Sequence, residues 1–60
     1  MQYPIIIHTN HATMEIEKDG SVSMEVYKPE LTDSDVARLR EGFDLAKRVK
    51  EEWEKMEEER

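Results

Sequence analysis

The apolar residues of the C-terminal third constrain the fold most, because their spacing predicts one long helix with two apolar faces. No proline interrupts residues 33–58. At about 100° per residue, the apolar side chains of this segment fall in two directions roughly 90° apart. Since one surface cannot cover both directions, we expect the first half to pack on the rest of the chain and the second half to contact another protein. The first set is Val36, Leu39, Phe43 and Ala46, and the second is Val49, Trp53 and Met56.

Three segments before this helix have the pattern of β-strands. Residues 3–8 are rich in isoleucine, and residues 12–17 and 21–28 alternate apolar and polar side chains. Short connections favour pairing in sequence order. The sequence therefore predicts an α+β fold in a single domain, residues 1–60. We expect a three-stranded antiparallel meander followed by one long C-terminal amphipathic helix at about residues 33–58.

An Asp-Gly pair predicts the connection between the second and third strands. A two-residue loop over 19–20 would pair Ile16 with Ser23 and mix apolar with polar faces. A three-residue loop over 18–20, with its glycine in the left-handed conformation, pairs Ile16 with Val22 instead. We therefore predict the three-residue turn.

The residues just before position 33 predict where the helix begins. Thr32 is the predicted N-cap, and Asp33 and Asp35 suit the positive end of the helix dipole. The predicted core combines one face of the strands with the first half of the helix. Its members are Ile5, Ile7, Met14, Ile16, Val22, Met24, Val26, Leu31, Val36, Leu39 and Phe43.

Composition limits the classes of function. A chain of 60 residues has a marginal core, so association with itself or a partner is an expected source of stability. With no cysteine, disulfides and thiolate metal sites are excluded, and cytoplasmic residence is expected. The net charge of −6 argues against nucleic-acid and anionic-membrane partners, and the apolar runs are too short to span a bilayer.

No group of residues predicts catalysis or cofactor binding. His8, His11 and Glu15 are acceptable zinc ligands, but three ligands leave a structural site one short. The serines lack a nucleophile-elbow context, and neither glycine lies in a phosphate-binding loop. We therefore expect a protein that is not an enzyme, with no catalytic, cofactor or metal residues.

The predicted interface consists of Val49, Trp53, Met56 and Ile6. Tryptophan is a frequent interface anchor, and Ile6 places an apolar side chain on the second face of its strand. A short antiparallel helix pair about a two-fold axis would give a homodimer. Alternatively, the patch framed by glutamates would bind an unidentified basic protein.

Two segments resemble pieces of the small HicB-type antitoxins: Tyr-Pro-Ile-Ile-Ile at 3–7 and Val-Tyr-Lys-Pro-Glu-Leu at 26–31. The resemblance implies a partial RNase-H-like domain that neutralises a basic RNA-cleaving toxin. The sequence lacks the Pro-Gly-Cys segment expected soon after Leu31. We expect a small acidic protein-protein interaction module, a homodimeric regulator or inhibitor of bacterial or phage type. A structural self-association module and a HicB-like antitoxin are the alternatives.

Overall fold

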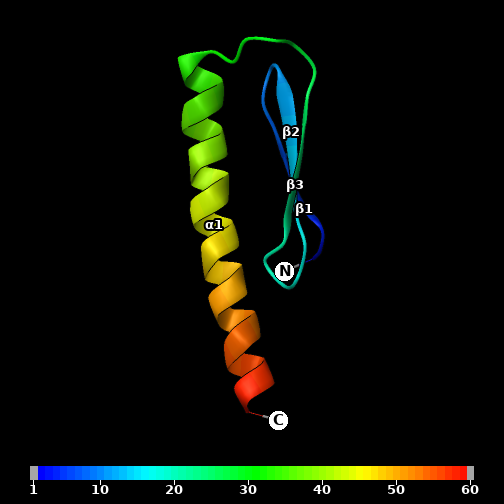
Figure 1. The fold of residues 1–60 in the computed structure, drawn as a ribbon, viewed down its shortest axis with the longest axis vertical. Helices are drawn as coiled ribbons and strands as arrows, with labels where there is room; N and C mark the ends of the chain where they lie inside the picture. Colours follow the sequence, from blue (N-terminus) through cyan, green and yellow to red (C-terminus); the bar gives the residue numbers. More distant parts are fainter. Residues whose placement is uncertain (1, 60) are drawn as a thin grey trace.

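The computed structural model describes residues 2–59 and has an α+β fold (Figure 1). The strands β1 (Ile5–His8), β2 (Ala12–Ile16) and β3 (Val22–Val26) form an antiparallel sheet in the order β1-β2-β3. One helix, α1 (Asp33–Glu58), follows and lies along one face of the sheet. The predicted meander and helix are therefore confirmed, although the strands are shorter than expected.

The connection between β2 and β3 is the three-residue turn. Ile16 pairs with Val22, as predicted, and the Glu17 N–H donates to the Ser21 carbonyl at 2.9 Å. Gly20 has φ +88°, the left-handed conformation that this turn requires. The turn thus fixes the register that places the apolar side chains of both strands on the face toward α1.

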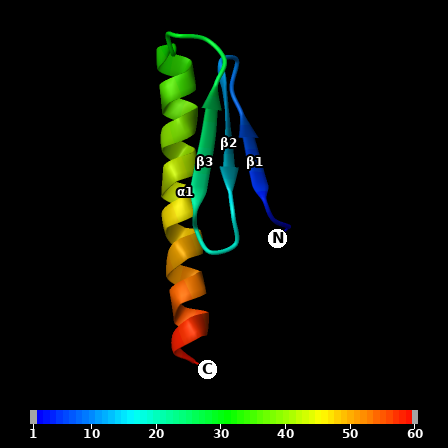
Figure 2. The same ribbon diagram turned by 45° about the vertical axis from the view of Figure 1, so that its right-hand side comes forward.

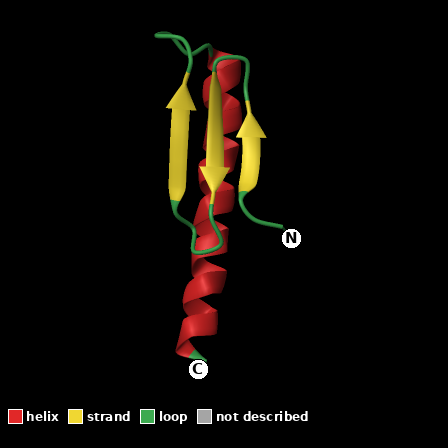
Figure 3. Ribbon diagram, turned by 90° about the vertical axis from the view of Figure 1, so that its right-hand side faces the viewer, coloured by secondary structure: helices red, strands yellow, loops and turns green. Residues whose placement is uncertain are grey.

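The helix lies behind the central strand when the sheet faces the viewer (Figure 3). A Cβ atom at Gly42 would lie 2.6 Å from the Met14 Sδ and 2.9 Å from the Ile7 Cδ1. The missing side chain at Gly42 therefore permits a close approach of α1 to β2 and β1. The buried residues of α1 are spaced alternately by four and three: Asp35, Leu39, Gly42, Ala46 and Val49.

The expectation of two separate helix faces is wrong. The sheet-facing direction lies between the two predicted ones, so it includes Leu39 and Ala46 from the first set and Val49 from the second. Val36 and Phe43 lie about 80–100° from its centre. A glycine is not counted as apolar when a helix face is predicted from the sequence. Gly42 nevertheless lies at the centre of the contact between α1 and the sheet.

The predicted core is correspondingly too wide. Its residues on β3 other than Val22, and those on the outer side of α1, stay exposed because the helix is centred on β2. Five predicted core residues are 36–48% exposed: Met24, Val26, Leu31, Val36 and Phe43. The buried core is Ala12, Met14, Ile16, Leu39, Ala46 and Val49, with Ile5, Ile7, Val22 and Leu45 partly buried against it.

The second half of α1 contacts the turn between β2 and β3 before it projects beyond the sheet (Figure 3). A Cβ at Gly20 would lie 2.5 Å from the Lys50 Cβ, and the Lys18 ammonium lies 5.7 Å from the centre of the Trp53 ring. The turn therefore packs on the helix near Lys50 and Trp53. Within residues 2–59, no helix is long and apolar enough to cross a membrane.

Gly20→Ala should destabilise the chain, because alanine disfavours the left-handed conformation and its methyl group would meet the Lys50 backbone. We expect a loss of about 1 to 3 kcal/mol of unfolding free energy, measured by thermal unfolding. Ser21→Ala, an exposed change in the same turn, is the control and should have little effect. An unchanged melting temperature for Gly20→Ala would contradict the turn geometry.

Val49→Ala should cost about 2 kcal/mol, from two lost carbon groups and the cavity left in the core. Met56→Ala should cost little, because Met56 is 54% exposed on the projecting end of α1. Chemical denaturation of both variants checks the pair. Equal stabilities would mean that Val49 does not face the sheet.

Candidate protein interface

An apolar groove lies between β3 and the first half of α1, which run side by side (Figure 2). It exists because the helix is centred on β2 and leaves the neighbouring strand β3 uncovered. Its volume is about 250 Å³. The lining residues are Met24, Leu31, Val36, Leu39, Arg40 and Phe43.

The groove brings together large apolar side chains that are exposed. Met24 lies on β3, and Val36 and Phe43 lie on α1, each more than two fifths exposed. A contiguous exposed apolar patch on a small soluble chain marks an interaction site more often than scattered apolar residues do. The groove is therefore the candidate interface.

The four predicted interface residues do not form one surface. Val49 is 6% exposed and belongs to the core, so the prediction that it lies beyond the reach of the sheet is wrong. Trp53 is half-buried beside Lys18. Met56 lies on the projecting end of α1, and Ile6 lies on the sheet face away from the helix. The apolar residues of the groove were all predicted to belong to the core, and among them Leu39 is buried there.

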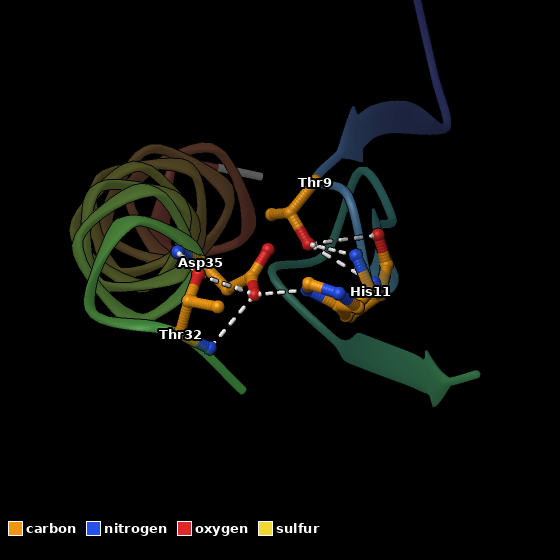
Figure 4. Close-up of polar contacts among 5 residues, drawn as sticks. Thr9, His11, Thr32 and Asp35 are labelled. Carbon is orange, nitrogen blue, oxygen red and sulfur yellow. Dashed lines mark hydrogen bonds and ion pairs between the residues drawn. The ribbon is translucent and has the colours of Figure 1, made fainter. Parts of the chain in front are cut away.

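A polar cluster holds the start of α1 against the turn between β1 and β2 (Figure 4). One carboxylate oxygen of Asp35, Oδ2, accepts from the Thr32 N–H at 2.9 Å and from the Thr32 hydroxyl at 2.8 Å. The same oxygen accepts from the His11 Nδ1 at 2.6 Å. The Asp35 N–H in turn donates to the Thr32 Oγ1, which completes a capping box. The predicted N-cap at Thr32 is confirmed.

These hydrogen bonds stabilise the ionised form of Asp35. The bond from the Thr32 backbone N–H lowers the pKa of Asp35 most, and the His11 and Thr32 side chains lower it further. Burial of the carboxylate raises the pKa, but less than the bonds lower it. The cluster satisfies its own polar groups and is a structural element that fixes the helix to the sheet.

The two histidines point to different neighbours. The His8 Nδ1 lies 3.2 Å from the Thr13 Oγ1, which also contacts the Tyr27 hydroxyl, whereas His11 binds Asp35. Among residues 2–59, no three histidine or carboxylate side chains are grouped to hold a metal ion.

Comparison of the chain with protein-family models, with curated proteins and with solved structures finds no match in any of the three. The similarity to HicB-type antitoxins therefore stays a prediction.

Asp35→Asn should flatten the acid dependence of stability. Because the folded-state pKa of Asp35 is lowered, its contribution is present above the unfolded value of about 3.9 and is lost as the pH falls below it. Melting temperatures from neutral to acidic pH should therefore fall less steeply for Asp35→Asn than for the wild type. Asp33→Asn removes the same charge from the same helical turn at an exposed position and should keep the wild-type slope. Equal slopes for all three proteins would mean that the Asp35 cluster does not form.

Proposed function

We propose that this chain is a small acidic protein-interaction module that acts as a homodimer, with the groove between β3 and α1 as its self-association surface. The observation that carries the proposal is the set of exposed apolar side chains lining that groove. In a dimer with a two-fold axis, the same patch on each subunit contacts its copy on the other, so this one surface is sufficient to form the dimer.

The exposed area supports association. The chain exposes 4830 Å², whereas a compact monomer of 7.1 kDa exposes about 4100 Å². The excess of about 700 Å² is close to the ~800 Å² that each partner loses in a standard interface. The molecule is 43 Å long and 17 Å wide, so its elongated shape accounts for part of this excess.

The small core supports the same proposal. Among residues 2–59, six apolar residues are buried and two of them are alanines, so the isolated chain has little apolar burial to offset its conformational entropy. Covering Met24, Val36 and Phe43 would add large side chains to this core. The chain has no cysteine to form disulfides, so we propose that association adds to its stability and that a reducing cytoplasm is its compartment.

Phe43→Arg should convert the dimer to a folded monomer, because it places a charge at the centre of the apolar surface while leaving the buried stripe of α1 unchanged. We expect the dimer dissociation constant to rise at least about tenfold, which is 1.4 kcal/mol. Sedimentation velocity over a concentration series measures this change, and circular dichroism checks the fold.

Met56→Arg is the matched control, because Met56 is about as exposed as Phe43 on the same helix but lies outside the groove. It should leave the dimer intact. A wild-type chain that stays monomeric at about 100 µM, well above the micromolar range of weak specific dimers, would overturn the proposal.

A further inference from the structure

The outer edge of β3 presents unpaired backbone groups. Hydrogen bonds join Glu17 to Ser21 and Tyr27 to His11 across the β2–β3 pair. Because bonded and non-bonded pairs alternate in an antiparallel ladder, the odd-numbered residues of β3 direct their N–H and C=O groups toward β2. The even-numbered residues direct theirs outward: Val22, Met24 and Val26.

This edge lacks most of the features that protect a free strand, and its one charged side chain is that of Glu25. The strand Val22–Val26 contains no lysine, proline or bulge, and it pairs in continuous register with β2. Its outward backbone groups belong to the same residues whose apolar side chains face the helix side of the sheet. The β3 edge, beside the groove, therefore has both free backbone hydrogen-bonding groups and apolar side chains with which a second strand could pair.

The other edge of the sheet is less available. On β1, the Thr9 N–H donates to the Ala12 carbonyl, so the odd-numbered residues bond to β2. The backbone N–H and C=O groups of Ile6 and His8 therefore point outward. The His8 carbonyl already accepts from the Arg38 Nε at 2.9 Å. A strand added there would compete with this bond, so β3 is the edge that the structure leaves open.

We propose that two copies of the chain pair β3 with β3, antiparallel, about a two-fold axis that passes beside Met24. The result is a continuous six-stranded sheet with both α1 helices on the same face. This inference rests on the proposed self-association and specifies its geometry.

The register follows from the outward groups and from charge. Centred on Met24, the pairing sets Val22 opposite Val26 of the second copy, and all three outward residues then form ladder bonds. On the open face it sets Glu25 opposite Ser23 of the second copy. A register centred on Glu25 would place two carboxylates directly opposite each other, which is unfavourable.

The groove lies at the level of this axis. Gly42 packs on Met14, and Met14 pairs with Met24, so Phe43 lies beside the two-fold axis and faces the groove of the second copy. Helices centred on the two β2 strands would be about 14 Å apart, three strand spacings. Helices in direct contact are about 8–10 Å apart, so the gap needs a layer of large side chains. Met24, Val36 and Phe43 of both copies supply that layer.

Disulfide cross-linking tests the register, because the chain has no cysteine of its own. Met24→Cys places two thiols on residues whose Cα atoms would be about 5.5 Å apart, within disulfide range. Val26→Cys is the matched control on the same strand and face. Its two copies would be offset by four residues, about 13 Å, which is too far. In a glutathione redox buffer, Met24→Cys should form covalent dimer at least about tenfold faster than Val26→Cys.

Amide hydrogen exchange supplies a second readout on the unmodified chain. In the dimer, the amides of Val22, Met24 and Val26 should be protected, and that of Ile6 should exchange rapidly. The protection should decrease on dilution as the dimer dissociates.

The outcomes separate this inference from the proposed function. A wild-type dimer in sedimentation with no Met24→Cys cross-link and fast exchange at β3 would overturn the edge pairing but keep self-association. Preferred cross-linking by Val26→Cys, which keeps both Glu25 carboxylates, would overturn the register. A monomer in sedimentation would overturn both proposals.

Discussion

The structure depends on the close approach of α1 to the centre of the sheet at Gly42. A side chain at this position would overlap with Met14 and Ile7, so the absence of a Cβ sets the distance between the two layers. The contact is consequently narrow. Gly42, with no side chain, and Ala46, with a short one, lie at the middle of the buried stripe of α1, and Leu39 and Val49 are buried on either side of them along the helix.

A narrow contact leaves two grooves along the helix, and they differ in chemistry. The groove beside β1 is lined by charged residues of α1, including Arg38, Glu41 and Arg48. The groove beside β3 has Arg40 as its one charged lining residue, among apolar side chains. The two sides of the sheet therefore differ: among residues 2–59, the β3 side has apolar side chains beside an open strand edge, whereas on the β1 side the His8 carbonyl is bonded to Arg38.

The sequence was sufficient for the element order, the hairpin register and the N-cap, because each depends on local chemistry. Gly20 and the alternating residues around it determine the turn, and Thr32 with Asp35 determines the helix start. The packing direction of α1 was not predictable in the same way. It depends on where Gly42 meets Met14, two residues far apart in sequence, and an apolar pattern gives a glycine no weight. Assigning Phe43 to the core and Val49 to an outer face both follow from that one omission.

The candidate interface was beyond sequence reasoning for a related reason. Val36 and Phe43 are as apolar as the residues of the core, and only the position of the helix on the sheet decides that they stay uncovered. The same holds for the β3 edge, because strand order alone does not show which edge carries a competing contact such as that of Arg38 with the His8 carbonyl.

The Asp35 Oδ2 oxygen accepts hydrogen bonds from both Thr32 and His11, and this sharing affects the order of folding. The first turn of a helix is costly to form, since several residues are fixed before hydrogen bonds compensate. Here the atom that caps that turn also accepts from a histidine 24 residues away, in the turn between β1 and β2. Closing the hairpin therefore raises the probability that the helix starts, and starting the helix holds the hairpin closed. The two parts are expected to appear together in the folding transition rather than one after the other.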